Sequence, residues 1–169
     1  MNNIVFVGFM GSGKTTLSKV LYKELVKENP DIKLIDTDAY IEEKLSRKIS
    51  DIFANEGEAY FRDIETETLR ELADAKGTII VSCGGGIVER KENLPILKSI
   101  GTVVFANTPI DILWKRVGND PSRPLSKDKD AFFALYNKRL NLYRSVADVI
   151  IDTGNGSIEK CVETVRRSL

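Results

Sequence analysis

The stretch from Gly8 to Thr16 constrains the fold of this chain more than any other part of the sequence. It reads GFMGSGKTT and fits the pattern G-x-x-x-x-G-K-[ST] of a phosphate-binding loop, or P-loop. The apolar run Ile4–Val7 before it predicts a buried strand, and apolar residues recur at helical spacing over residues 17–25 after it. Strand, loop and helix are the context that this motif needs, which disfavours a simple glycine-rich turn.

Each position of the loop has a physical task in holding a di- or triphosphate. The glycines let the backbone approach a ligand with its N–H groups turned inward, and the following helix directs its positive end to the same point. Lys14 can reach the β- and γ-phosphates, and the Thr15 hydroxyl can ligate Mg²⁺, which prefers oxygen ligands. The predicted nucleotide-binding residues of the loop are Gly11, Ser12, Gly13, Lys14, Thr15 and Thr16.

The composition excludes several other classes of function. Lys plus Arg and Asp plus Glu both number 25, so no overall basic field attracts nucleic acid or an acidic membrane. The sequence contains no histidine, so any general base must be a carboxylate or a lysine, and its two cysteines lack the spacing of a metal site. Because no apolar run approaches the ~20 residues of a membrane span and no leader-like stretch precedes the first strand, we expect a soluble, cytoplasmic protein.

Short apolar runs alternate with helical patterns along the whole chain. The expected strands are 4–7, 32–35, 78–82, 102–106 and 148–152. This alternation, without a repeat or a linker, predicts a single α/β domain over residues 1–169, with a five-stranded parallel sheet and helices on both faces. Among local signals, Ser50 is expected to cap a helix, and Thr108-Pro109 resembles the start of a capping box.

Two carboxylates follow the second expected strand. Asp36 and Asp38 stand where ligands bind in open α/β sheets, which is the crevice at the carboxyl ends of the strands. Either aspartate could instead cap the helix that begins near Ala39. The pair, beside a P-loop, favours a site.

A run of glycines follows the third expected strand. Gly84, Gly85 and Gly86 would leave bare backbone for a substrate at the same edge, or form a flexible turn into the next helix. Arg62 lies on a preceding helix, where spacing alone favours a surface pair with Glu58 or Glu65.

Two further arginines belong to helices near the end of the chain. Arg139 sits in the middle of an apolar helix face, so it needs a partner, which is either a protein carboxylate or an anionic ligand. Arg116 falls off the buried stripe of its helix and is free to meet a ligand or solvent. Residues 118–130 are polar with little periodicity, which predicts a mobile lid that could carry Arg123 onto the transferring phosphate.

These features favour phosphoryl transfer to a small molecule by a P-loop kinase fold, with one carboxylate deprotonating the acceptor hydroxyl. The sequence resembles shikimate kinase over most of its length. The matching blocks are the P-loop, Asp36-Thr37-Asp38, Phe61-Arg62 with Glu65, Gly84-Gly85-Gly86, Arg123-Pro124-Leu125, and Arg139 followed by Tyr143.

The resemblance implies ATP-dependent phosphorylation of the 3-hydroxyl of shikimate, with Mg²⁺ as cofactor and a substrate-binding region at about 37–65. It implies that Asp38 binds the acceptor hydroxyls and acts as base, and that Arg62 and Arg139 hold the shikimate carboxylate. It also implies that Gly84–Gly86 touch the ring hydroxyls and that Asp36 holds through water the Mg²⁺ bound by Thr15. Lys14 is implied to bind the phosphates, and Arg116 to lie against the adenine. Arg123 is implied to reach the phosphates from the lid. Lys14, Asp38 and Arg123 form the predicted catalytic set.

Two other functions remain open at this point. Another small-molecule P-loop kinase, for gluconate or a nucleoside monophosphate, would explain Lys14, Thr15 and the lid. A non-catalytic nucleotide-binding module would keep the fold without turnover. We also expect a monomer, because the sequence shows no obvious unburied apolar face.

Overall fold

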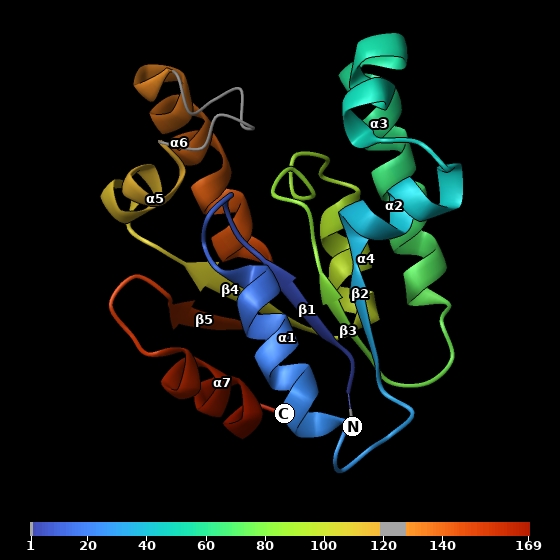
Figure 1. Ribbon diagram of the computed structural model, residues 1–169, viewed down its shortest axis with the longest axis vertical. Coiled ribbons are helices and arrows are strands. Elements are labelled where there is room, and N and C mark those ends of the chain that lie inside the picture. The colour runs from blue at the N-terminus through green and yellow to red at the C-terminus, as the bar shows by residue number, and fades with distance from the viewer. Residues whose placement is uncertain (1, 119–127) are drawn as a thin grey trace.

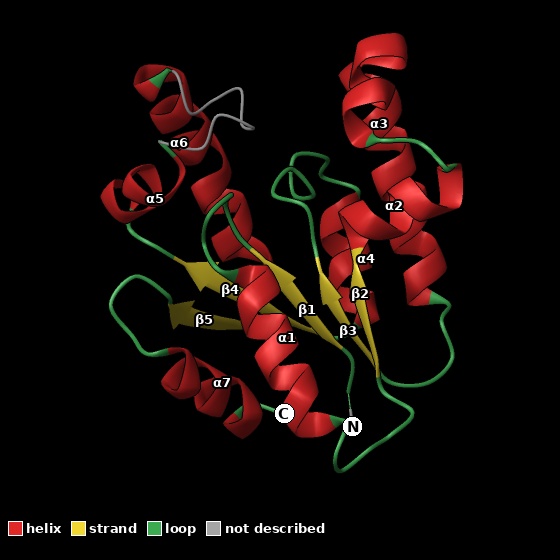
Figure 2. Ribbon diagram, in the orientation of Figure 1, coloured by secondary structure: helices red, strands yellow, loops and turns green. Residues whose placement is uncertain are grey.

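The computed structural model describes residues 2–118 and 128–169, and a single parallel sheet forms its centre. Within these residues five strands are paired in the order β2-β3-β1-β4-β5 (Figure 2). The strands are β1 (Ile4–Val7), β2 (Lys33–Asp36), β3 (Ile79–Ser82), β4 (Thr102–Asn107) and β5 (Val149–Asp152). The five-stranded parallel sheet expected from the sequence is confirmed.

The helices cover both faces of the sheet, as predicted. They are α1 (Lys14–Leu25), α2 (Thr37–Leu45), α3 (Ile49–Ala73), α4 (Asn93–Ile100), α5 (Ile110–Val117), α6 (Lys129–Val146) and α7 (Ile158–Arg167). Figure 1 shows α1 and α7 in front of the sheet, α4 and part of α6 behind it, and α5 beyond the end of β4. Among the described helices, none has the length and apolar character needed to cross a bilayer.

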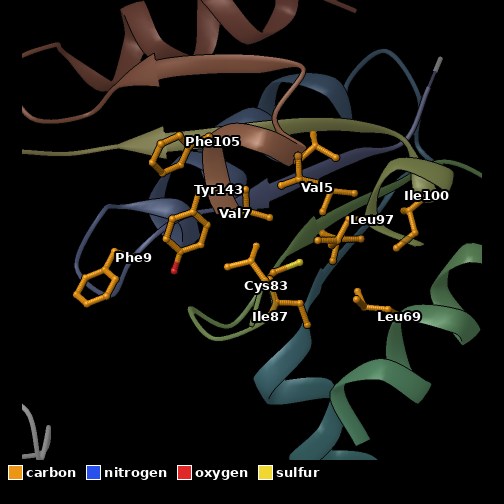
Figure 3. Close-up of a cluster of buried hydrophobic side chains, with 14 of the residues drawn as sticks. Val5, Val7, Phe9, Leu69, Cys83, Ile87, Leu97, Ile100, Phe105 and Tyr143 are labelled. Carbon is orange, nitrogen blue, oxygen red and sulfur yellow. The ribbon is translucent and has the colours of Figure 1, made fainter. Parts of the chain in front are cut away.

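Each face of the sheet carries its own apolar core because successive strand residues point to opposite sides. Ile4 and Phe6 pack with the leucines of α1 and the valines of α7. Val5 and Val7 pack on the other side with residues from α3 to α6, among them Leu97 and Tyr143 (Figure 3). The two cores fix β1, and therefore the loop that follows it, at the middle of the molecule.

A smaller apolar cluster holds α2 against α3, beyond the edge of the sheet. Ile41, Ile52, Phe61 and Ile64 form it. α3 is interrupted at Gly57, whose φ of 85° and ψ of 176° are not helical, so Arg62 lies on the segment after the break.

Two predicted helix caps are wrong. α3 begins at Ile49, before Ser50, and the N–H of Ile49 donates to Oε1 of Glu42 at 3.0 Å. The hydroxyl of Thr108 hydrogen-bonds the hydroxyl of Thr153 at 2.6 Å and does not cap α5. In both cases a partner from another element replaced the local one.

Candidate active site

Three loops meet beyond the carboxyl ends of β1, β2 and β3, which is where ligands bind in open α/β sheets. They are the P-loop after β1, the aspartate pair at the end of β2, and the glycine run after β3. In Figure 1, α2 and α3 stand on one side of this edge and α5 and α6 on the other. The strand order therefore gathers segments that are far apart in the sequence.

The P-loop has a backbone that only glycine readily adopts. Gly11 and Gly13 have φ values of 79° and 89°, in the left-handed region. A Cβ on Gly11 would also lie 2.6 Å from Cγ2 of Val117. α1 begins directly after Gly13, and no described side chain caps it, so the N–H groups of its first turn are available to an anion.

A cavity of about 390 Å³ brings the predicted phosphate and acceptor residues together. We call it the central cavity, and its lining residues are Met10, Gly11, Gly13, Lys14, Thr15, Thr16, Asp36, Asp38, Cys83, Gly84 and Gly85. The Nζ atom of Lys14 donates to the carbonyls of Gly8 at 2.8 Å and Phe9 at 3.0 Å, so its charge lies over the loop.

The two aspartates at the end of β2 have different roles. Oδ1 of Asp36 accepts hydrogen bonds from the N–H groups of Asp38 at 3.1 Å and Ala39 at 3.2 Å, so Asp36 is the cap of α2. Asp38 lines the central cavity, where a Cβ on Gly84 would lie 2.6 Å from its Oδ1. Burial raises the pKa of Asp38, and the charge of Asp36 raises it further, while Lys14 and Arg62 act in the opposite direction.

The glycine run is held in place by side chains from two other elements, α2 and α6. The N–H of Gly84 donates to Oγ1 of the buried Thr37 at 2.9 Å. The hydroxyl of Tyr143 donates to the carbonyl of Gly85 at 2.5 Å. Residues of α2 and α6 therefore hold this wall of the cavity through hydrogen bonds to its backbone.

Arg62 forms both of the pairs considered from its spacing, and it is not a surface residue. Its Nη1 donates to Oε2 of Glu65 at 2.5 Å, and its Nε and Nη2 donate to Oε1 of Glu58 at 3.3 and 3.0 Å. The side chain of Arg62 is 12% exposed and that of Glu65 is 1% exposed. A Cβ on Gly86 would lie 2.1 Å from Nη1 of Arg62, so this guanidinium packs directly on the glycine run.

Arg139 is buried, and its partner in the protein is Glu89. Nε and Nη2 of Arg139 both donate to Oε1 of Glu89, at 2.8 and 2.5 Å. Nη1 lies by Gly85, at 3.6 Å from the position of a Cβ there. Arg62 and Arg139 therefore reach the glycine run at neighbouring residues, from opposite sides of the site.

A second cavity of about 310 Å³, the outer cavity, adjoins the P-loop on the side of α7. Its lining residues are Gly11, Ser12, Gly13, Thr16, Leu17, Arg116, Thr153, Gly156, Ile158 and Cys161. Nη1 of Arg116 donates to the carbonyl of Gly11 at 3.1 Å, and Nη2 donates to that of Thr153 at 2.9 Å. Oγ of Ser12 is buried without a hydrogen-bond partner among the described residues.

The oxygen ligands of the central cavity suit a hard cation. Thr15, Asp36 and Asp38 line it together, whereas residues 2–118 and 128–169 contain no group of three or more His, Cys, Asp or Glu placed to hold a metal ion. This donor set fits Mg²⁺, which commonly takes one or two protein ligands and completes its shell with water and phosphate oxygens. Arg123 and most of the predicted lid over 118–130 lie outside the described residues.

Of the residues that shape this site, Glu89 was not considered from the sequence, and Thr37 and Tyr143 stood in the quoted blocks without a role of their own. Glu89 pairs with Arg139, Thr37 binds Gly84, and Tyr143 binds Gly85. The position of Thr37 between two aspartates at a strand end was a usable signal. Glu89 lies in a segment without periodicity, and no local pattern connects it to α6.

Comparison with known proteins agrees with this geometry. A sequence model described as shikimate kinase matches residues 10–169. The shikimate kinase of Dictyoglomus turgidum is 41% identical over 163 residues, which cover 94% of this chain and 92% of that protein. The solved shikimate kinase from Acinetobacter baumannii in complex with shikimate has a TM-score of 0.86 and 33% identity, covering 99% of this chain and 92% of that one.

A gluconokinase from Sinorhizobium meliloti 1021 is similar in fold alone, with a TM-score of 0.56 and 14% identity over 96% of this chain and 88% of that one. The likeness to the shikimate kinases extends instead to the sequence, over nearly the full length of both chains. Lys14, Asp38 and Gly84, which belong to the blocks quoted from the sequence, line the central cavity. This chain belongs to the shikimate kinase family.

Proposed function

We propose that this protein transfers the γ-phosphoryl group of ATP to the 3-hydroxyl of shikimate, giving shikimate 3-phosphate and ADP. The observation that carries the proposal is the content of the central cavity. Lys14 and Thr15 of the P-loop line it together with Asp38 and the glycine run, and Arg62 and Arg139 border that run. A phosphate site, a base and two cations for a carboxylate are thus in one place.

The P-loop residues serve the nucleotide. The N–H groups of the first turn of α1 and Nζ of Lys14 are placed to neutralise the phosphates. The outer cavity, which Arg116 borders, is the proposed adenine site, and Ser12 faces it from the loop. Thr15 and Asp36 would hold Mg²⁺, Asp36 through water, and the ion would neutralise charge on the β- and γ-phosphates.

The residues across the cavity serve the acceptor. Asp38 is proposed to accept the proton of the acceptor hydroxyl. As this happens, the hydroxyl oxygen attacks the γ-phosphorus, and the bond between the γ-phosphorus and the oxygen that bridges it to the β-phosphate breaks. Arg62 and Arg139 would hold the carboxylate of the acceptor, which fixes the ring so that one hydroxyl faces Asp38. The backbone of Gly84–Gly86 would contact the ring hydroxyls.

The other features predicted from the sequence stay predictions. They are the role of Arg123, the lid over 118–130, the cytoplasmic location and the monomeric state. The first two concern residues outside the described ranges, at least in part.

Coupled ADP release with Mg-ATP tests the proposed reaction. The acceptors are shikimate, gluconate, CMP and AMP, and the control omits the acceptor. We expect ADP release that depends on shikimate alone. Release with another acceptor would retain a P-loop kinase of different specificity, and ATP binding without release for any acceptor would indicate a non-catalytic module.

Replacing Arg139 with alanine should raise the KM for shikimate by about 100-fold, because a buried partner of the substrate carboxylate is lost. The KM for ATP should change less, although Arg139 also contacts the P-loop, with its Cζ 5.7 Å from the centroid of the Phe9 ring. Steady-state kinetics of Arg139→Ala are compared with Arg144→Ala, which removes an exposed arginine from the same helix. An unchanged KM for shikimate with a lowered Tm would mean that the Arg139–Glu89 pair is structural only.

Placing alanine at Gly86 should raise the KM for shikimate by about 10- to 100-fold, because the new methyl group would displace the guanidinium of Arg62. The Tm should also fall, because the displaced guanidinium is the hydrogen-bond partner of Glu65, whose side chain is 1% exposed. Kinetics and thermal unfolding of Gly86→Ala give both quantities. A wild-type KM would show that the position of Arg62 does not matter for shikimate.

A further inference from the structure

Glu89 stands at a junction between the glycine run and α6. It follows the run by three residues, and its N–H donates to the carbonyl of Gly86 at 3.0 Å. Its side chain is 15% exposed and that of Arg139 is 7% exposed, so the pair is largely shielded from solvent. The residue thus connects the wall of the central cavity to the arginine beside it.

The contact between the two residues fixes the orientation of the guanidinium. One oxygen, Oε1 of Glu89, accepts from both Nε and Nη2 of Arg139, which define one edge of the planar group. The other oxygen accepts from Nζ of Lys138 at 3.3 Å. With that edge held, Nη1 is the part of the guanidinium that lies at Gly85.

The charges around Glu89 keep its carboxylate ionised. Burial opposes ionisation, but the hydrogen bonds and charge of Arg139, with the charge of Arg62, hold the pKa of Glu89 below its usual range. An ionised carboxylate is the form that accepts both N–H groups without offering a competing donor.

We propose that Glu89 is a positioning residue that orients Arg139 toward the carboxylate of the substrate. The inference rests on the proposed function, because it assigns Arg139 to the shikimate carboxylate. Glu89 itself lines neither the central cavity nor the outer cavity. It holds the far edge of the guanidinium, and Nη1 is thereby presented at Gly85, where the acceptor binds.

Three variants of Glu89 separate orientation from charge. Glu89→Gln keeps an oxygen at the same reach but removes the charge. Glu89→Ala removes both, and Glu89→Asp keeps the charge but shortens the reach. Lys138→Ala is the matched control, because it removes the other partner of Glu89, a side chain that is 63% exposed.

We expect the KM for shikimate to rise about tenfold in Glu89→Ala, with kcat and the KM for ATP within about twofold of wild type. Glu89→Gln should stay within about threefold, because its amide oxygen can still accept from Nε and Nη2. Lys138→Ala should match wild type. If Glu89→Ala does not fold, Glu89→Asp serves in its place, with a rise of several-fold expected from its shorter reach.

Two results would overturn the proposal. A lowered KM for shikimate in both Glu89→Ala and Glu89→Gln would mean that Glu89 competes with the substrate for Arg139. An unchanged KM in both variants, with a lowered Tm, would mean a structural ion pair. The comparison of Glu89 variants does not test the proposed function itself. That function would be refuted if the wild-type protein released ADP only with a different acceptor.

Discussion

Replacement of Asp38 with asparagine should lower kcat by about 10²- to 10⁴-fold, the range expected when a general base is lost. Asp38 lines the same cavity as Lys14 and Thr15, and no histidine exists in the chain to replace it. ATP binding should persist, because the P-loop residues are unchanged. Pre-steady-state phosphoryl transfer and nucleotide titration together measure both effects.

The stability of the Asp38→Asn variant provides the control for this result. Because burial and the nearby charge of Asp36 raise the pKa of Asp38, the ionised side chain destabilises the folded state. This destabilisation is absent at a pH below the pKa that Asp38 has in the unfolded protein. It is fully present at a pH above the pKa that Asp38 has in the folded protein, so it applies at neutral pH. The variant should therefore unfold at the same temperature as wild type or higher. Wild-type turnover in the variant would reduce Asp38 to a structural role.

The same raised pKa has a signature in the pH dependence of the wild-type enzyme. The base must be deprotonated, so kcat/KM for shikimate should fall on the acid side at a pH above that expected for an ordinary aspartate. This decrease of kcat/KM at acid pH should be missing from the pH profile of the residual activity of Asp38→Asn.

Replacement of Lys14 with methionine should lower kcat by about 10²- to 10³-fold, as expected when a cation that stabilises the transferring phosphoryl group is removed. Methionine keeps the length of the side chain but cannot donate to the phosphates or to the carbonyls of Gly8 and Phe9. Lys19→Met, which changes an exposed lysine on the same helix, is the matched control and should keep wild-type kcat.

Thermal unfolding identifies the reason for any loss in Lys14→Met. Lys14 also anchors the loop, so a small fall in Tm is expected. If kcat stayed within a few-fold of wild type, Lys14 would hold the loop without acting on the phosphates. Loss of kcat with retained ATP binding would place its role in the transition state.

Much of the fold could be predicted because its signals are local. The strands are short runs of β-branched and apolar residues, and all five were found with boundaries within one or two residues. The P-loop was recognisable because a nucleotide site needs glycine at fixed spacing, and Gly11 and Gly13 do adopt left-handed backbone.

The predictions that failed depended on partners from other segments of the chain. Glu42 reaches the start of α3 across a helix boundary, and Thr153 at the end of β5 attracts the hydroxyl of Thr108. No spacing rule relates such pairs, because tertiary packing brings them together.

The arginines of the site illustrate the same limit. Periodicity placed Arg139 on a buried helix face, where an arginine needs an anionic partner. It could not identify Glu89 as that partner, because Glu89 lies in the loop that follows the glycine run. For Arg62 the spacing named both partners, Glu58 and Glu65, but misjudged burial, because the glycine run packs against its guanidinium.

The central place of β1 has a consequence for the biosynthesis of the protein. β1 is made first, yet its neighbours in the sheet are β3 and β4, so Ile4 pairs with Ile80 on one side and Thr102 on the other. Such long-range parallel pairing is slow to form. A nascent chain can complete the pairing of β1 only after residues up to Asn107 have left the ribosome, so the apolar strand β1 lacks its neighbours in the sheet until then.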